Sequence, residues 1–428
     1  MYQSIDHGSD FQIIVMEDKT SGLVLNNALN QLPFQQLLEK VFNFSLQNHF
    51  SVAVYRLPSD GKIRMLADVS GSYQKVSTDL EELPEGFIFS PFSNLDNNAA
   101  LFIRKGIALS ETSGLQFDGH IALQEAEKIV SSLSNFRNQT SNIAVSPNQP
   151  PKDTSKEDYC RLVSKAIDTF EEGQFQKVVI SRSKTLALQS TFDILKAFHE
   201  LCKNYPYAFV SVVSIPNIGT WLGASPEVLI SVDKNKVFKT SAVAGTQSFQ
   251  SGMDVAEVGW TQKEIEEQAM VSRYIINCFK KIRLREFEEI GPRTAQAGNL
   301  VHLKTDFIVD THTVSYPQLG SVMINLLHPT SAVCGTPRST SLDFISNYEN
   351  YDRSFYSGYL GPVNINDESH LYVNIRCVQV FTDKVVLYAG AGITHWSKPD
   401  KEWEETEMKM KTMIDIFAKS GFINSNIT

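Results

Sequence analysis

Two stretches with helical periodicity carry carboxylates at spacings that could bind a metal ion. The last helical stretch contains Glu402, Glu405 and Lys409, and offsets of three and four residues put such side chains on one helix face. An earlier stretch carries Glu264 and Glu267. If the two helices converge, these carboxylates could hold Mg²⁺, which commonly takes one or two protein carboxylates and keeps places for water and an anionic substrate. Solvated helix faces with Glu–Lys ion pairs have the same spacing, so both interpretations stay open.

Two further residues could transfer protons. Lys177 heads a β-rich apolar run, and Glu227 follows Pro226 between two β-rich segments. A desolvated lysine can act as a general base, and a glutamate with a raised pKa can act as a general acid. A lysine at the edge of a strand and a glutamate in a turn are the alternative, and the residue types alone do not decide between them.

Two glycine-containing segments follow β-rich runs. They are AGT at 244–246 and AGAG at 389–392. Glycines at strand ends let backbone N–H groups approach a carboxylate or phosphate closely. Neither segment is a GxGxxG that opens a helix, so dinucleotide binding is poorly supported. Ordinary turns are the alternative interpretation.

These residues must be positioned by a mixture of strands and long helices. A polar segment at 137–156, rich in Asn, Ser, Gln and Pro, indicates an exposed connection. Antiparallel pairs and long helices favour an α+β fold in one large domain, with the last four strands forming two hairpins. The expected helices are 30–48, 123–136, 158–172, 260–281 and 401–418, and the expected strands are 11–16, 51–56, 63–67, 101–103, 177–188, 220–232, 237–243, 370–382 and 385–391.

The composition describes an acidic globular protein. Of 428 residues, 39 are Lys or Arg and 48 are Asp or Glu, which gives a formal net charge of −9, and 42% of the residues are hydrophobic. A disordered chain would be less apolar, and the negative balance argues against nucleic acid or an anionic membrane as the main partner. The five cysteines are scattered without a CxxC pair, which favours reduced thiols. Because the chain shows no signal-peptide pattern and no run of about 18 apolar residues, we expect a cytoplasmic protein.

Ordered motifs after the polar segment resemble those of the chorismate-utilising enzymes, which include isochorismate, salicylate, anthranilate and aminodeoxychorismate synthases. The resemblance covers residues 158–418. It implies a single large α+β domain, in which large antiparallel sheets pack face to face between helices as an α/β/β/α sandwich. In that fold 1–136 would be a divergent N-terminal part, 137–156 a polar surface linker and 157–420 the chorismate-binding catalytic region. The motifs are, in order, KVVISR (177–182), GASPEVL (223–229), AVAGT (242–246), KEIEEQAMV (263–271), HLKT (302–305), LHPTSAVCGTPR (327–338), IRC (375–377), AGAGI (389–393) and SKPDKEWEETEMK (397–409).

Three features sort the chain within that family. Members that add ammonia usually have Gln where this chain has Lys177, and a lysine there resembles the water-activating base of isochorismate and salicylate synthases. Aminodeoxychorismate synthases usually carry a nucleophilic lysine where this chain has Ala244. The segment LHPTSAVCG (327–335) is similar to the pattern of isochorismate synthases rather than salicylate synthases. The resemblance therefore implies an isomerase, an isochorismate synthase. Salicylate synthase is the alternative, and a catalytically inactive homologue that serves as a binding module is a remoter one.

The reaction that the resemblance implies is the reversible, Mg²⁺-dependent conversion of chorismate to isochorismate. Lys177, as the neutral amine, would take a proton from the water that attacks the ring. Glu227, protonated, would donate to the hydroxyl that leaves from the opposite face. The double bonds shift between these two events, so no redox cofactor is needed. A general acid and a general base must then lie on opposite faces of the ring.

The resemblance also assigns residues to the metal and to the substrate. Glu267 and Glu405 would bind Mg²⁺, with Glu402 as a further ligand and Glu264 acting through water. Lys409 would bind the substrate carboxylate beside the metal or stabilise Glu405. The residues expected to contact the substrate are Ala244, Gly245, Thr246, His302, Ala332, Val333, Tyr356, Arg376, Gly390, Ala391, Gly392 and Lys409.

Several positions depart from the family pattern. Gln247 stands where Arg is common, Gln268 where His often follows the metal-binding glutamate, and Ser331 where Pro is usual. None of them is a proposed acid, base or metal ligand, so activity is expected. For His302 a structural role is the alternative to contact with the substrate. Members that use water generally need no glutaminase subunit, so we expect a monomer whose partner is the small molecule chorismate.

Overall fold

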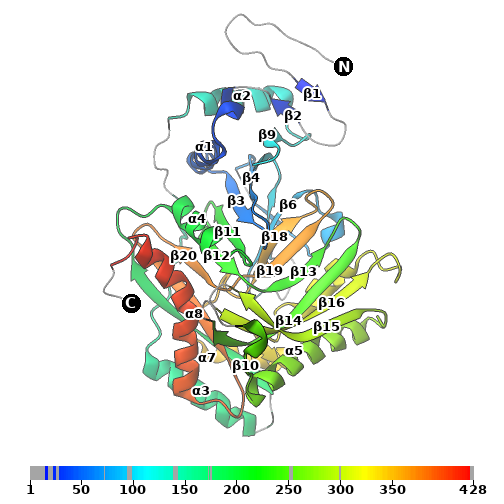
Figure 1. The fold of residues 1–428 in the computed structure, drawn as a ribbon. Coiled ribbons are helices and arrows are strands. Elements are labelled where there is room, and N and C mark those ends of the chain that lie inside the picture. The colour runs from blue at the N-terminus through cyan, green and yellow to red at the C-terminus, as the bar shows by residue number, and fades with distance from the viewer. Residues whose placement is uncertain are drawn as a thin grey trace, which may run out of the picture.

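The computed structural model describes residues 15–17, 23–25, 28–71, 73–93, 99–137, 143–171, 173, 176–249, 254–297 and 300–424. In this part of the chain the strands form two large antiparallel sheets (Figure 1). The first sheet has twelve strands in the order β1 (Val15–Glu17), β2 (Leu23–Leu25), β9 (Gly114–Phe117), β8 (Ile107–Ser110), β4 (Ile63–Asp68), β3 (Ser51–Arg56), β11 (Phe209–Ile215), β12 (Gly219–Ser225), β20 (Cys377–Val380), β21 (Lys384–Ile393), β10 (Lys177–Ala187) and β17 (Gly335–Thr336).

The second sheet has nine strands, and each pairing is again antiparallel. Its order is β15 (Glu288–Ala297), β16 (Leu300–Asp310), β14 (Val237–Ser248), β13 (Val228–Val232), β19 (Ser369–Val373), β18 (Tyr359–Val363), β6 (Gly86–Ser90), β7 (Ala100–Arg104) and β5 (Gln74–Val76). Strands from before and after the 137–156 segment therefore meet in each sheet, because β3 pairs with β11 and β6 pairs with β18.

A buried layer of aromatic side chains joins the two sheets. Successive side chains of a strand point to opposite faces, so on β3 Tyr55 faces the second sheet while Val54 faces the helices. Phe209 of β11 stacks on Tyr372 of β19, with 4.1 Å between ring centroids. The predicted α+β sandwich, with sheets packed face to face in a single large domain, is confirmed.

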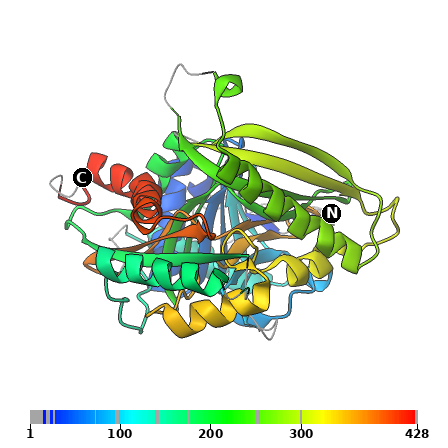
Figure 2. The same cartoon turned by 90° about the horizontal axis from the view of Figure 1, so that it is seen from below.

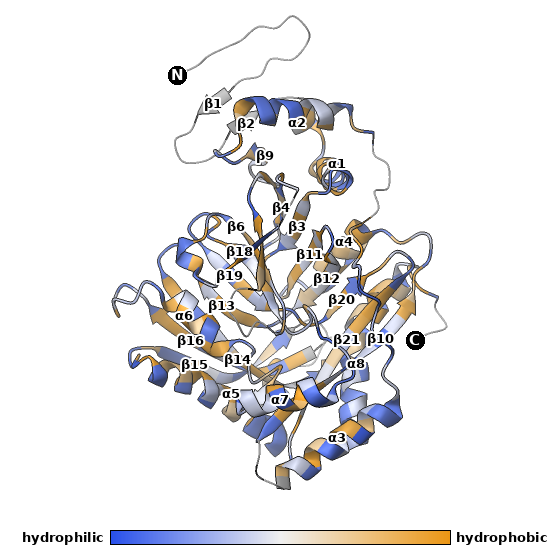
Figure 3. Cartoon of the chain, turned by 180° about the vertical axis from the view of Figure 1, so that it is seen from behind, coloured by the Kyte–Doolittle hydropathy of each residue, from blue (hydrophilic) through white to orange (hydrophobic). Residues whose placement is uncertain are grey.

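Helices cover the outer faces of both sheets. They present apolar residues inward and polar residues outward, which Figure 3 shows as orange and blue on the same helix. Four pack on the first sheet, namely α1 (Phe34–Gln47), α2 (Leu123–Asn135), α4 (Ile194–Asn204) and α8 (Pro399–Lys419). Two pack on the second sheet, namely α5 (Gln262–Lys281) and α6 (Leu319–Leu327).

The remaining helices lie at one end of the first sheet. They are α3 (Lys156–Glu171) and α7 (Arg338–Tyr348), which pack against β10 and β21, and Figure 2 shows both from below. Short 3₁₀ turns complete the described part of the fold at Ala28–Gln31, Leu80–Glu82 and Val255–Glu257. Among the described residues, no helix has both the length and the apolar character needed to cross a bilayer.

Two strands that the sequence predicts as continuous are each divided between the sheets. The expected strand 220–232 is β12 in the first sheet and β13 in the second, and the chain crosses over at Pro226 and Glu227. The expected strand 370–382 is β19 in the second sheet and β20 in the first, with the crossing at Arg376. A bent strand that changes sheets keeps its apolar alternation on both sides of the bend, so the pattern conceals the crossing. Both crossings carry residues predicted to act in catalysis or binding.

Candidate active site

A cavity of about 280 Å³ lies where the two crossings meet helices α5 and α8. Its walls come from β10, β14, β21, the segment after α6 and the two crossings. The lining residues are Val179, Pro226, Glu227, Val243, Ala244, Gly245, Gln247, Thr261, Lys263, Glu264, Glu267, His302, Ala332, Val333, Tyr356, Ile375, Arg376, Gly390, Glu405 and Lys409.

Glu227 is a buried carboxyl group on one wall of this cavity. Only 7% of the residue is exposed, and the Oγ1 of Thr330 lies 3.5 Å from its Oε1. Burial disfavours the charged form and raises the pKa of Glu227 to about 7, although Lys177 and Arg376 nearby oppose the shift. A substantial fraction of Glu227 is therefore protonated at neutral pH. Such a group can donate a proton to a leaving hydroxyl.

Lys177 lies behind Glu267. Its Nζ is 2.7 Å from Oε1 of Glu267, and the lysine is 1% exposed. Burial by itself would raise the pKa of Glu267, but the Lys177 ammonium holds it below its ordinary value. A Cβ added at Gly392 would lie 3.2 Å from the Lys177 Nζ, so the glycine leaves room for the amine.

One ion pair joins helices α5 and α8, and a second lies within α8. Lys263 of α5 binds Oε1 of Glu402 on α8 at 2.8 Å, and Lys409 binds Glu405 at 2.7 Å. Burial alone would lower the pKa of Lys263, but Glu402 and Glu405 hold it above its ordinary value. Lys409 also donates to the carbonyl of Gly390, which fixes α8 against β21.

The carboxylates at this junction fit a hard cation. Glu267 and Glu405 both line the cavity, and oxygen ligands are what Mg²⁺ prefers. Within the described residues Oε2 of Glu402 is buried without a hydrogen-bond partner, which is costly unless a further group satisfies it. Among those residues, no three His, Cys, Asp or Glu side chains are grouped closely enough to hold an ion by themselves. An ion at this junction would therefore complete its shell with water or substrate oxygens.

Arg376 and Tyr356 form the part of the cavity suited to a carboxylate. Arg376 adopts a left-handed backbone conformation (φ 52°) at the crossing between β19 and β20. Burial lowers the pKa of Arg376, yet a guanidinium stays charged at neutral pH. Burial raises the pKa of Tyr356 to about 12, so its phenol remains a hydrogen-bond donor. A Cβ added at Gly390 would lie 3.2 Å from the Tyr356 hydroxyl, so the glycine keeps this wall open.

A bulge in β14 shapes another part of the wall. Gly245 has φ 69° where the register of β14 and β16 shifts, and its carbonyl lies 2.8 Å from Nδ1 of His302. Burial lowers the pKa of His302 to about 4, so the ring is neutral and Nδ1 donates to that carbonyl. Gln247 donates to both carboxylate oxygens of Glu264, which also accepts from the N-cap Thr261. Glu264 is therefore engaged in the capping box of α5.

The structure places most of the predicted site residues in or directly behind the wall of the cavity. Glu227, the metal-ligand candidates Glu267 and Glu405, and most of the expected substrate contacts line the cavity. Lys177, Gly392 and Glu402 lie directly behind lining residues, and Ala391 faces the apolar cluster beside α3 and α7. The side chain of Thr246 lies outside the described part of the structure. Those that line the cavity are Glu227, Ala244, Gly245, Glu267, His302, Ala332, Val333, Tyr356, Arg376, Gly390, Glu405 and Lys409.

Some lining residues carry no role in the sequence-based prediction. Lys263 is the most significant, because it is cationic and stands one helical turn before Glu267. The i, i+4 spacing of these two residues is a signal that could have identified it. The others contribute mainly apolar surface or backbone. In the sequence, only their closeness to motif residues indicates that they lie at the site. They are Val179, Pro226, Val243, Thr261 and Ile375.

Comparison with known proteins gives a family and several relatives. The model of the chorismate binding enzyme family matches residues 97–418. A vibriobactin-specific isochorismate synthase of Vibrio cholerae is 27% identical over 265 residues, which cover 61% of this chain and 66% of that protein. Isochorismate synthase EntC of Escherichia coli is 27% identical over 296 residues, which cover 68% of this chain and 74% of that protein. The match thus spans about two-thirds to three-quarters of the length of these relatives.

A solved structure shares the fold. MenF, the menaquinone-specific isochorismate synthase from Escherichia coli, superposes with a TM-score of 0.70 over 88% of this chain and 90% of that chain. The sequences are 19% identical, so this likeness concerns the fold alone.

Proposed function

Because this chain belongs to the chorismate binding enzyme family, we propose that it is an isochorismate synthase, an isomerase that converts chorismate reversibly to isochorismate. The observation that carries the proposal is the buried Glu227, which can be protonated at neutral pH, in one cavity with Arg376, and near enough to Lys177 for the lysine charge to affect its pKa. Relatives named as isochorismate synthases, from two bacterial species, support the same reaction.

The proposed reaction needs a base and an acid, and it leaves the atomic composition of the substrate unchanged. Lys177, once separated from Glu267 and in its amine form, takes a proton from the water whose oxygen bonds to the ring. The ring double bonds shift, and the hydroxyl on the opposite face leaves with the proton of Glu227 as water. One water is consumed and one is released, so chorismate and isochorismate are isomers and no oxidant or reductant is required.

The substrate is a dianion, and the charge of the cavity bears on how it binds. Four cationic side chains (Lys177, Lys263, Arg376 and Lys409) are balanced by four carboxylates (Glu264, Glu267, Glu402 and Glu405) in and directly behind the wall. We propose that Glu267 and Glu405 hold Mg²⁺, with Glu402 next to them, and that the ion when bound supplies positive charge for the ring carboxylate. Arg376 and Tyr356 then hold the second carboxylate.

Incubation of the protein with chorismate and Mg²⁺ tests the proposal. We expect isochorismate as the product, identified by chromatography against a standard. Fluorescent salicylate with an equal amount of pyruvate would instead show a salicylate synthase. Binding of chorismate without turnover in either direction would show a binding module. The same assay needs no ammonia or glutamine, since we propose that no glutaminase subunit takes part.

The setting of the enzyme is also part of the proposal. We propose a monomer in the cytoplasm, and the five cysteines, which are all free thiols and three of them buried, support a reducing compartment. The names of the relatives and the structural neighbour include a vibriobactin-specific and a menaquinone-specific enzyme. Genomic neighbours would assign the product to one of these kinds of pathway.

A further inference from the structure

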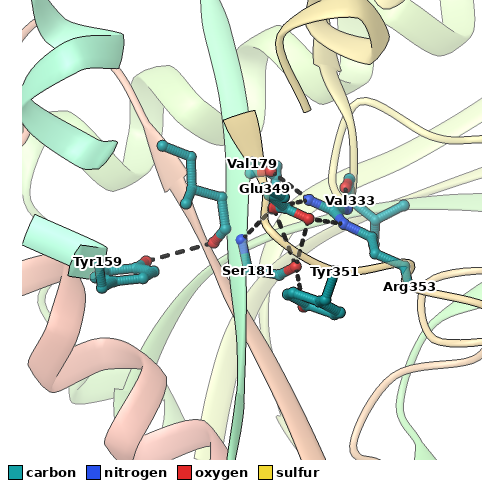
Figure 4. A network of polar contacts seen from close by, with 8 residues as sticks. Tyr159, Val179, Ser181, Val333, Glu349, Tyr351 and Arg353 are labelled. Carbon is teal, nitrogen blue, oxygen red and sulfur yellow. Dashed lines mark hydrogen bonds and ion pairs between the residues drawn. The ribbon is translucent and has the colours of Figure 1, made fainter. Parts of the chain in front are cut away.

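A buried ion pair lies just outside the cavity, and neither of its residues lines the cavity (Figure 4). Glu349 and Arg353 are each 2% exposed in their side chains, and the guanidinium binds both carboxylate oxygens, at 2.7 Å through Nε and 2.5 Å through Nη2. The ring of Phe92 packs against the guanidinium, whose central carbon lies 4.4 Å from the ring centroid. Removing both charges from water costs free energy. The other groups that the pair binds therefore indicate which role it serves.

The guanidinium of Arg353 ties together two walls of the cavity. It donates through Nη1 to the carbonyl of Val333 at 2.8 Å and through Nη2 to the carbonyl of Val179 at 2.7 Å. Both of these residues line the cavity. Val179 lies on β10, two residues after Lys177, and Val333 lies in the segment after α6. Figure 4 shows the guanidinium between them.

The segment that contains Val333 also contains Thr330, which contacts the proposed acid, Glu227. Its backbone is folded so that the N–H groups of Val333 and Cys334 both donate to the carbonyl of Thr330. The hydroxyl of Thr330 in turn lies 3.5 Å from Glu227. Arg353 is therefore bonded on one side to the strand of the proposed base and on the other to the turn that contacts the proposed acid.

Glu349 fixes the same strand at a second point. Its Oε1 accepts from the backbone N–H of Ser181 at 2.7 Å, and the Ser181 hydroxyl contacts both the carboxylate and the hydroxyl of Tyr351. On the other side of β10, Tyr159 of α3 donates to the carbonyl of Ile180 at 3.4 Å. The strand that carries Lys177 is thus held by polar groups from two directions.

We propose that Glu349 and Arg353 are positioning residues that set the placement of Lys177 relative to Glu227. This inference rests on the proposed acid and base roles of those two residues. A planar guanidinium can bind a carboxylate and two diverging carbonyls at once, whereas a lysine ammonium in its place cannot reproduce that geometry. If the strand that carries Lys177 shifts by about 1 Å relative to the turn that contacts Glu227, the rate can fall on the order of 10²-fold. Substrate binding depends on other groups, chiefly Arg376.

The test compares two buried arginines. Arg353→Lys is matched by Arg56→Lys, because Arg56 is also buried and donates to three main-chain carbonyls, those of Tyr205, Pro206 and Ala208. None of these three residues lines the cavity. For both variants the full-length protein is assayed for kcat and KM with chorismate and Mg²⁺, and thermal unfolding is recorded.

We expect Arg353→Lys to lower kcat by about 10-fold to 100-fold with KM changed less than about threefold. Arg56→Lys should lose a similar amount of thermal stability without a comparable loss of kcat. Glu349→Gln, which keeps the shape and one acceptor, should fall between the unaltered protein and Arg353→Lys. Equal kcat values in Arg353→Lys and Arg56→Lys would overturn the proposal.

Amide hydrogen exchange gives a readout that does not depend on turnover. Arg353→Lys should speed exchange at Val179, Ser181, Val333 and Cys334 together, whereas Arg56→Lys should leave these four amides unchanged. Unchanged exchange in Arg353→Lys would show that the pair does not couple the two walls. If the unaltered protein fails to convert chorismate, the proposed function is wrong, and the exchange result still decides whether the two walls are coupled.

Discussion

At the scale of single residues, the burial of Glu227 has a consequence for stability as well as for chemistry. Its pKa rises from 4.5 to about 7 in the folded protein, so between these values the folded state binds more protons than the unfolded state. The free energy of unfolding must then fall as the pH rises through this window and stay lower above it. A shift of this size corresponds to roughly 3 kcal/mol.

Glu227→Gln removes this penalty because the amide has no proton to lose. In the metal-free protein we expect the variant to be more stable than the unaltered protein by roughly 1–3 kcal/mol at pH 8, and by much less at pH 5. Urea unfolding at the two pH values measures the difference. The same gain at both values would mean that Glu227 is not held protonated by burial. Turnover of the variant should be lost at either pH.

Lys177 makes a separate prediction about catalysis. Lys177→Ala should lower kcat by about 10²–10⁴-fold, the usual contribution of a general base, while Mg²⁺-dependent binding of chorismate remains measurable by calorimetry. Lys184→Ala is the control, since Lys184 lies on the same strand, pairs with Glu407 and does not line the cavity. A Lys177→Ala enzyme that retains near-normal turnover would exclude this residue as the base.

The sequence indicates which motif residues lie near one another, while their roles stay predictions. Glu267, Glu405 and Arg376 line the cavity where the ordered motifs suggested they would meet. It does not predict that Glu402 is engaged by Lys263, because either partner could equally have paired within its own helix. Glu349 and Arg353 have the i, i+4 spacing of a helical pair, but α7 ends at Tyr348. The carbonyls that Arg353 binds belong to Val179, 174 residues away, and to Val333, 20 residues away, and the spacing indicates neither.

At the scale of elements, the two strand crossings position the acid and the cationic anchor. Glu227 and Arg376 each stand where the chain leaves one sheet for the other, which turns their side chains into the cavity rather than onto a sheet face. A Cβ added at Gly223, just before the first crossing, would lie 2.8 Å from Cys377, so the strands that flank the crossings approach closely. Hydrophobic alternation cannot reveal such a crossing, because it continues through the bend.

Helices α5 and α8 bring the proposed metal ligands together from segments more than a hundred residues apart. We expect Glu405→Ala to raise the Mg²⁺ concentration needed for half-maximal activity by at least about tenfold, since a carboxylate ligand is lost. Mg²⁺ binding measured by calorimetry should weaken in parallel. Glu404→Ala is the control, because Glu404 is exposed and pairs with Lys401. An unchanged Mg²⁺ requirement in Glu405→Ala would refute the assignment.

At the scale of the whole molecule, the described strands before residue 137 belong to the same two sheets as the later strands. Strand β3 completes the pairing of β11, and β6 completes that of β18. The aromatic layer between the sheets includes Tyr55 and Phe87, which pack against Phe209. The net charge of −9 is a property of the whole molecule and does not describe the cavity, where the cationic side chains are balanced by carboxylates.

Removal of residues 1–136 should therefore prevent the rest of the chain from folding alone. Two central strands, β11 and β18, would become unpaired edges. Buried aromatic residues would also lose their partners, and Phe→Ala changes in cores put the cost for each such residue at about 3–5 kcal/mol. We expect an insoluble product, or one without a cooperative thermal transition by circular dichroism. Removal of residues 1–27 is the control, since their described part consists only of the edge strands β1 and β2. A fragment 137–428 that melts cooperatively and converts chorismate would show instead that the catalytic region is an independent domain.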